Sequence, residues 1–149
     1  MTLANTEMDT DTPAEIRQLL HRYVASVLAK DVEAFVALYD ADLRVFDMWN
    51  SWSHDGRQPW REMVQGWFGS LRDERVAVAF SEVQARVAQD LAVLHAFVSF
   101  AAIDAGGATL RSMTNRITMA LARRGDEWKI VHQHTSAPID GETKAIFQR

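Results

Sequence analysis

The chain has 149 residues, of which 48% are hydrophobic and 24% charged, and its net charge is −4 at neutral pH. These values are typical of one folded domain with room for a core, and they exclude a largely disordered chain. The basic residues are scattered rather than clustered, which argues against a nucleic-acid partner. Because the chain has no cysteine, disulfides, thiolate metal sites and cysteine nucleophiles are excluded.

The start of the chain is polar and acidic, unlike a signal peptide, and no apolar run reaches membrane-spanning length. We therefore expect a cytoplasmic protein with no membrane partner. Residues 1–11 show no apolar periodicity and are expected to form a disordered tail. The remainder, residues 12–149, is expected to be a single domain.

Two helix starts stand out in the first third of the chain. Thr12, Pro13 and Glu15 have the spacing of a capping box with a proline at the first helical position. Apolar residues then recur at three- and four-residue steps, which predicts a helix that ends near Lys30. Asp31 is positioned to cap a second, shorter helix.

A first strand is predicted over residues 43–49, with Leu43, Val45 and Asp47 on one face. Residues 50–58 have loop composition, and Pro59 can open a third helix. An aspartate that shares a strand face with leucine and valine is unusual, because carboxylates are rarely buried without a reason.

From Val76 onward the sequence alternates, with turn signals that divide it into four long antiparallel strands at about 76–88, 91–103, 108–122 and 127–137. A change of phase near Glu82 predicts a bulge. The order α-α-β-α-β-β-β-β indicates an α+β fold, in which a curved antiparallel sheet forms a cone that three helices close. Such a cone leaves an apolar cavity at its open end.

The last strand carries His132 and His134 two residues apart, so alternation places both imidazoles on one face, together with Trp128 and Ile130. Such a pair could be half of a metal site, completed by His95 or Asp47. No spaced third ligand accompanies it, so the prediction is no metal and no cofactor. His21 and His54 are expected to face solvent.

The stretch His21–Asp47 resembles the opening helices and first strand of ketosteroid isomerase. The sequence NRIT followed by GDEWKIVHQHTSAP is similar to the ending of SnoaL-like proteins and of the association domain of the calmodulin-dependent kinase. Together these stretches resemble the nuclear transport factor two-like superfamily, from Pro13 to Pro138. The resemblance implies the cone fold but no single activity, because the superfamily includes isomerases, cyclases, dehydratases and oligomerisation domains.

The resemblance to the isomerase implies three catalytic residues. Tyr23 matches the tyrosine of the oxyanion hole, Asp47 matches the general base, and Asn115 falls on or next to the position of the protonated aspartic acid. The last match is a departure, because an amide donates a hydrogen bond but cannot act as an acid.

Each of these residues also has a purely structural interpretation. Asp47 could bind the loop at residues 50–53, and Tyr23 could be a core residue. Arg116 and His134 belong to the SnoaL-like ending, and they could either bind a ligand or hold a dimer interface. Strand alternation separates Arg116 from Asn115, so only one of the two faces the cone unless a bulge intervenes.

Four of the five tryptophans lie between residues 49 and 67. Trp60 and Trp67, on the apolar stripe of the third helix, favour core packing, whereas Trp49 and Trp52 favour a pocket mouth or a partner surface. The predicted ligand-binding residues are Trp49, Trp52, Trp67, Phe97, Arg116, His132 and His134.

Two functions follow from these observations. The first is a small enzyme that transfers protons without a cofactor, as an isomerase, cyclase or dehydratase, on an apolar carbonyl-containing metabolite. The second is a non-enzymatic ligand-binding or oligomerisation module. In both cases the expected partners are an apolar small molecule and a second copy of the chain.

Overall fold

The computed structural model describes residues 11–142. The described residues form three helices and six strands, in the predicted order except for one additional two-residue strand. The elements are α1 (Ala14–Ala29), α2 (Val32–Val36), β1 (Tyr39–Phe46), β2 (His54–Asp55), α3 (Arg57–Ser70), β3 (Arg75–Ala88), β4 (Leu91–Ile103), β5 (Thr109–Arg124) and β6 (Glu127–Ser136). The tail expected at residues 1–11 falls, apart from residue 11, outside the described residues, and the single domain over 12–149 stays a prediction.

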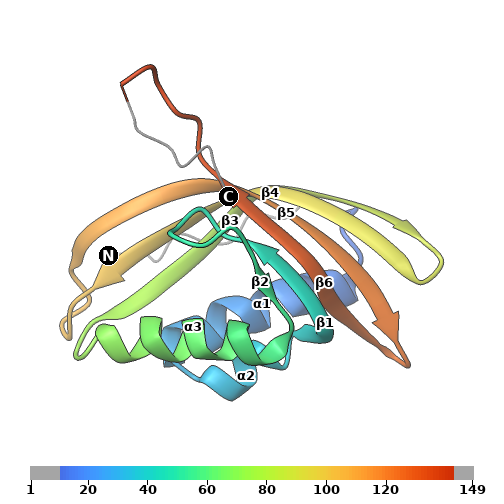
Figure 1. Ribbon diagram of the computed structural model, residues 1–149, viewed down its shortest axis with the longest axis horizontal. Helices are drawn as coiled ribbons and strands as arrows, with labels where there is room; N and C mark the ends of the chain where they lie inside the picture. Colours follow the sequence, from blue (N-terminus) through green and yellow to red (C-terminus); the bar gives the residue numbers. More distant parts are fainter. Residues whose placement is uncertain (1–10, 143–149) are drawn as a thin grey trace.

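The strands form one sheet in the order β2-β1-β6-β5-β4-β3. The four long strands pair antiparallel with their sequence neighbours, as predicted, whereas β1 lies parallel to β6. The sheet arches over the helices, which lie on its concave side (Figure 1). The predicted α+β fold, a curved sheet with three helices, is confirmed, and the sheet itself is unclosed.

The two predicted helix starts have different outcomes. Asp31 caps α2, because its Oδ1 accepts a hydrogen bond from the Ala34 backbone N–H at 3.0 Å. The capping box at α1 is wrong: Pro13 is the N-cap residue and no side chain caps the helix. Glu15 instead accepts hydrogen bonds from the side chains of Arg123 and Trp128, so its carboxylate is directed toward β5 and β6 and away from the helix end.

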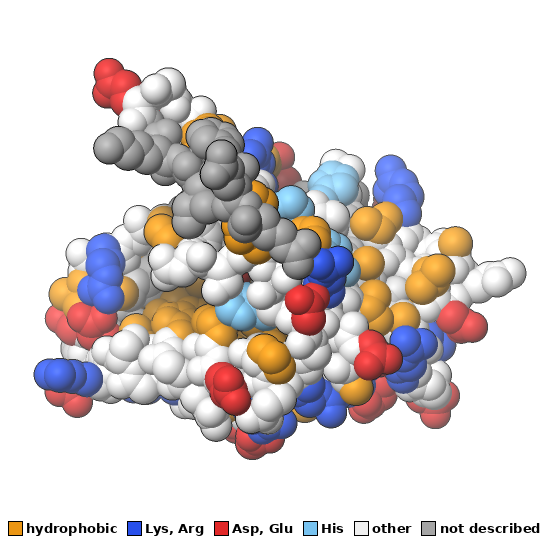
Figure 2. All heavy atoms as spheres, viewed as in Figure 1, with side chains coloured by type: hydrophobic (Ala, Val, Ile, Leu, Met, Phe, Trp, Pro, Cys, Tyr) orange, Lys and Arg blue, Asp and Glu red, His pale blue; other side chains and the backbone are white. Residues whose placement is uncertain are grey.

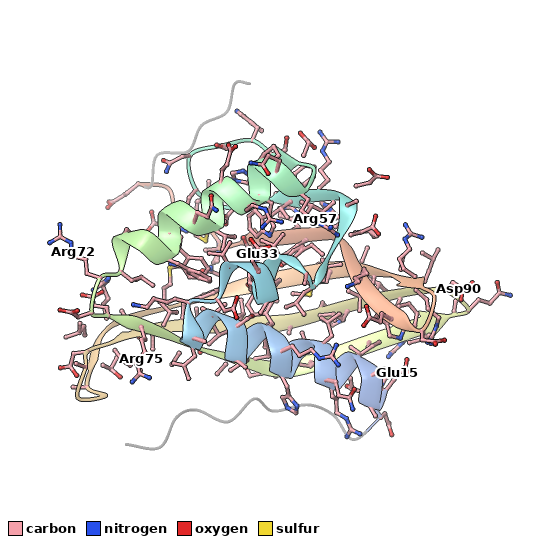
Figure 3. The ribbon with its side chains drawn as sticks, turned by 90° about the horizontal axis from the view of Figure 1, so that it is seen from below. Glu15, Glu33, Arg57, Arg72, Arg75 and Asp90 are labelled. Carbon is pink, nitrogen blue, oxygen red and sulfur yellow. The ribbon has the colours of Figure 1, made fainter. Side chains whose placement is uncertain are left out.

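The strand β1 begins four residues earlier than predicted, at Tyr39, and ends just before Asp47. Tyr39 is in register with Ile130 of β6, and the register shifts between Tyr39 and Arg44. Arg57, at the start of α3, donates a hydrogen bond to the Tyr39 carbonyl oxygen at 2.9 Å and so ties α3 to β1 (Figure 3). Tyr39 is thereby held between helix and sheet.

A bulge in β3 is confirmed at the predicted place. Glu82 has a φ of 52°, and the register with β4 shifts between Ser81 and Gln84. The extra residue lets Phe80 and Val83, which differ in parity, both point into the core.

A second bulge, in β6, was not predicted. Leu121 pairs with Ile130 but Ala120 pairs with His132, so Val131 is an extra residue in β6. Trp128 and Ile130 point inward before this bulge, and Gln133 and Thr135 point inward after it. The prediction that Trp128, Ile130, His132 and His134 share a face is therefore wrong, because alternation is interrupted between them.

Aromatic rings fill the centre of the core between the helices and the sheet. Phe35 of α2 lies at the middle of this group, with ring centroids 4.9 Å from Tyr23, 5.4 Å from Tyr39 and 6.0 Å from Phe68. The contacts with Tyr23 and Phe68 are edge-to-face, an arrangement that stabilises a core beyond the burial of its area. They also fix the inner end of the cavity described next.

Candidate functional site

A cavity of about 500 Å³ opens between α3 and the concave face of the sheet. Figure 2 shows it as a hollow with hydrophobic side chains inside. Its apolar walls comprise Phe35, Trp49, Trp60, Met63, Trp67, Leu71, Val76, Phe100, Ala102 and Met113. Ten polar side chains interrupt these walls: Tyr23, Asp47, Asn50, Ser51, His54, Arg111, Ser112, Asn115, Gln133 and Thr135. This size and this mixture are typical of a site for a small, mainly apolar molecule.

Asp47 faces the cavity directly after β1. Its Oδ1 accepts hydrogen bonds from the Thr135 hydroxyl at 3.1 Å and from the Met48 backbone N–H at 2.8 Å. Its Oδ2 has no hydrogen-bond partner among the residues that the structure describes. The carboxylate is therefore oriented through one oxygen, while the other is available to a ligand.

Tyr23 reaches the same cavity from α1 and is only 2% exposed. Burial, and secondarily the negative charge of Asp47, raises the pKa of its phenol well above the ordinary value. The hydroxyl therefore keeps its proton even above the pH at which an ordinary tyrosine ionises, and it can act as a hydrogen-bond donor.

A second buried tyrosine, Tyr39, lies beside the first. Its hydroxyl donates to the side-chain oxygen of Gln133 at 2.6 Å. Burial, followed by the neighbouring Tyr23, raises the pKa of Tyr39, so this phenol also stays protonated. Tyr39, Gln133 and Thr135 were missed in the sequence, because the shifted start of β1 and the bulge in β6 decide that they face inward.

Asn115 and Arg116 take opposite faces of β5, which resolves the alternative left open above. Asn115 is 4% exposed and lines the cavity. Arg116 lies on the outer, convex face, where its Nε donates to the Ser136 hydroxyl at 3.2 Å. Of these two residues, only Asn115 can contact a molecule in the cavity.

The tryptophans divide between wall and surface. Trp49 and Trp67, both predicted to bind ligand, line the cavity, and so does Trp60. Trp52 is 49% exposed and does not. His54, which we expected to face solvent, lines the cavity and packs against Trp60 with ring centroids 5.4 Å apart.

The structure does not bring Phe97, His132 and His134 to the cavity. Phe97 pairs with Arg116 on the convex face and is 40% exposed. The Nδ1 of His132 lies 2.7 Å from the Arg44 carbonyl oxygen, and the Phe46 ring contacts both histidine rings. These side chains, with Arg116, form a separate surface on the far side of the sheet from the cavity.

Within residues 11–142, no three histidine, aspartate or glutamate side chains lie close enough together to hold a metal ion. The pair His132 and His134 thus lacks the third ligand that His95 or Asp47 was considered to supply. None of the helices in this part of the chain is long and apolar enough to cross a membrane.

The cavity, the curved sheet and the three helices have a clear counterpart among known families. Residues 16–140 match the SnoaL-like domain. The chain belongs to the SnoaL-like family. The superfamily resemblance seen in the sequence is thereby confirmed.

Solved structures agree with this SnoaL-like assignment. An NTF2-like protein of unknown function from Pseudomonas putida is 26% identical, with 96% of this chain and 99% of that chain covered and a TM-score of 0.77. Aln2 from a Streptomyces species is 14% identical, with 87% and 92% covered and a TM-score of 0.75. An NTF2-like protein with a cystatin-like fold from Novosphingobium aromaticivorans is 20% identical, with 86% and 82% covered and a TM-score of 0.70. No curated protein matches the sequence.

Proposed function

We propose that this SnoaL-like protein is an enzyme that transfers protons without a cofactor on an apolar, carbonyl-containing small molecule. The observation that carries the proposal is the meeting of Asp47 and Tyr23 at one cavity. Asp47 offers an unpartnered carboxylate oxygen, and Tyr23 offers a buried phenol hydroxyl that can donate a hydrogen bond. Enolisation requires a base to remove the proton and a hydrogen-bond donor to stabilise the enolate oxygen, and both groups lie here beside an apolar space.

In the proposed reaction, Asp47 Oδ2 removes a proton from the carbon next to the carbonyl group. The electron pair of the broken C–H bond moves to the carbonyl oxygen, which becomes an enolate. Tyr23 and Asn115 donate hydrogen bonds to that oxygen. In a substrate with a β,γ double bond, transfer of the proton from Asp47 to the γ-carbon gives an isomerase. In a substrate with a β-hydroxyl group, that group leaves as water with the proton that Asp47 holds, which gives a dehydratase.

The surrounding side chains support this chemistry. Thr135 holds Asp47 Oδ1, so the free Oδ2 keeps a fixed direction. The aromatic walls displace water, which strengthens each electrostatic interaction in the cavity. Family membership supports the proposal, because SnoaL-like domains are often enzymatic, but it does not name a substrate.

Proton abstraction can be tested before any natural substrate is known. We expect the wild-type protein to accelerate exchange of the C2 protons of 1-tetralone for deuterium in D₂O, followed by NMR. Asp47→Asn should reduce the enzymatic rate by at least about 100-fold, the usual contribution of a general base. Tyr23→Phe should reduce it by about 10-fold or more.

Asp42→Asn is the matched control, since Asp42 is exposed on the strand that precedes Asp47. This variant should exchange at the wild-type rate. Circular dichroism and thermal unfolding establish that each variant is folded. An Asp47→Asn protein that still exchanges at the wild-type rate would contradict the proposal.

The convex face favours a second function, assembly into a homodimer. Leu91, Val93 and Phe97 lie along β4 on that face and are 63%, 45% and 40% exposed, with the exposed His95 between Val93 and Phe97. A second copy could cover such an apolar row. The two functions are compatible, because the cavity opens on the opposite side of the sheet.

A further inference from the structure

Two buried amides, Gln133 and Asn115, face the cavity with hydrogen-bonding capacity to spare. Their side chains are 3% and 4% exposed. Among the described residues, nothing hydrogen-bonds the Gln133 Nε2 group or either polar atom of the Asn115 side chain. Among the described residues, completely buried side-chain polar atoms that lack a hydrogen-bond partner occur only at Thr12, Arg57 and Trp60. The unpaired atoms of Gln133 and Asn115 are therefore not completely enclosed by protein. The free ends of both amides therefore border the open space of the cavity.

The orientation of Gln133 is fixed by Tyr39. The Tyr39 hydroxyl donates to Gln133 Oε1 at 2.6 Å, which uses the acceptor end of the amide. The remaining end of the amide, the Nε2 amino group, can only donate hydrogen bonds. Gln133 thus presents donors to the cavity, whereas Asn115 can donate or accept.

Register places these two amides on either side of Thr135, the residue that binds Asp47. Thr135, which binds Asp47, pairs with Ile117 of β5, and Gln133 pairs with Met119. Asn115 lies two residues beyond Ile117 in the other direction, so Gln133 and Asn115 differ by four residues along the strands. That offset corresponds to about 13 Å, at roughly 3.3 Å per residue. A molecule next to Asp47 can therefore reach Asn115 with one end and Gln133 with the other.

We propose that Gln133 is a specificity-determining residue, which donates a hydrogen bond from Nε2 to a second oxygen atom of the substrate. The substrate class is then a flat, mainly apolar cyclic ketone with an alkoxy, hydroxy or keto oxygen at the end away from the reacting carbonyl group. This inference rests on the proposed function, since it takes the same cavity as the substrate site.

The physical reason is the cost of an unsatisfied amide. In the empty cavity, water can occupy the donors of Gln133. A ligand oxygen that displaces the water replaces its hydrogen bond, whereas an alkyl group leaves a buried donor unpaired. The site should therefore discriminate between ligands of equal size that differ only in one oxygen.

Two tetralones form a matched pair of probes for this discrimination. 6-Methoxy-1-tetralone and 6-ethyl-1-tetralone have the same ring, the same carbonyl group and substituents of equal length, but only the first has the second oxygen. In isothermal titration calorimetry, we expect the methoxy compound to bind the wild-type protein about 5-fold more tightly, as one neutral hydrogen bond predicts. Gln133→Met, which keeps the size and shape of the side chain, should bring the two affinities to within about 2-fold.

Two further variants complete the test. Gln84→Met makes the same exchange at an exposed position on β3 and should keep the wild-type preference. Gln133→Glu keeps an acceptor for Tyr39 but turns a carboxylate oxygen toward the ligand, so it should reverse the preference in favour of the ethyl compound. Binding of the ethyl compound also establishes that the cavity of each variant is intact.

Equal affinities in the wild-type protein, failure of both tetralones to bind, or a methoxy preference that survives in Gln133→Met would each overturn the inference. Because these measurements are equilibrium binding, they are separable from the proposed function. Loss of the role of Asp47 in exchange would leave the methoxy preference unchanged. Absence of the preference would leave the exchange result for Asp47→Asn unchanged.

Discussion

The polar side chains around the cavity differ in how many of their hydrogen-bonding atoms have a partner. Asp47 is held through one oxygen, and Gln133 is held through its carbonyl oxygen. Asn115 has no side-chain hydrogen bond within the described part of the chain. Because buried polar groups are normally paired, the unpaired ends mark the positions where a ligand would complete the arrangement.

The two buried tyrosines should make the free energy of unfolding depend on pH. Tyr23 and Tyr39 are the only tyrosines of the chain, and burial raises the pKa of both. In the unfolded chain a tyrosine ionises near pH 10. Above that pH the unfolded state releases protons that the folded state retains, so the free energy of unfolding falls as pH rises.

Each tyrosine should contribute a slope of about 1.4 kcal/mol per pH unit above about pH 10. In urea unfolding, Tyr23→Phe should therefore lose stability less steeply than the wild-type protein, by about that amount per unit. Phenolate absorbance should appear only as the protein unfolds. Parallel slopes for the two proteins, or a phenolate signal from folded protein, would contradict the prediction.

Residue-level prediction from the sequence succeeded where local neighbours decide the direction of a side chain. Asp47 follows Leu43 and Val45 on one strand face, and Tyr23 lies on the apolar stripe of α1; both point inward as expected. Gln133 was not recognised because an inward direction for it requires the bulge at Val131. That bulge depends on the pairing of β5 with β6, which alternation within one strand does not reveal.

At the scale of elements, two bulges decide which residues meet in the cavity. The β3 bulge at Glu82 left a signal in the sequence, because apolar residues change parity across it. The β6 bulge left none, because Trp128, Ile130, His132 and His134 continue one alternation through it. The same limit applies to β1, whose start at Tyr39 depends on pairing with Ile130.

The short helix α2 carries Phe35, the central ring of the cavity's inner wall, and its cap is the element-level contact to test. Asp31 accepts the Ala34 N–H, one of the donors left free at a helix start. Asp31→Ala should lower the free energy of unfolding by about 1 kcal/mol in urea titration, the usual loss for an N-cap. Asp31→Asn keeps an acceptor and should lose less than half of that. Equal losses in both variants would show that the cap hydrogen bond is not the cause.

At the scale of the whole molecule, the curved sheet separates two environments. The helices lie against its concave face (Figure 1) and enclose the cavity with it, whereas side chains of β4 on its convex face are exposed. Arg116, His132 and His134 belong to the convex face. The stretches that resemble SnoaL-like endings therefore contribute side chains to both faces of the sheet. An account of this protein therefore needs a role for the outer surface as well as for the cavity.

We predict that the outer surface is a homodimer interface. A two-fold axis would bring the apolar row of Leu91, Val93 and Phe97 in one copy against the same row in the other. In sedimentation equilibrium, the wild-type protein should have twice the chain mass. Phe97→Glu should weaken the dimer by at least about 10-fold, because dimerisation would bury an unpaired carboxylate.

Val87→Glu is the control for that experiment. Val87 is also exposed, but it shares the inward parity of Val83 at the end of β3, so its change should leave the dimer unaffected. A monomeric wild-type protein would remove the assembly function and leave the exposed row on β4 without a partner. A dimer that tolerates Phe97→Glu but not Val87→Glu would place the contact at the end of the hairpin that joins β3 to β4. In either case the exchange and tetralone measurements would stand, because they depend on the concave side alone.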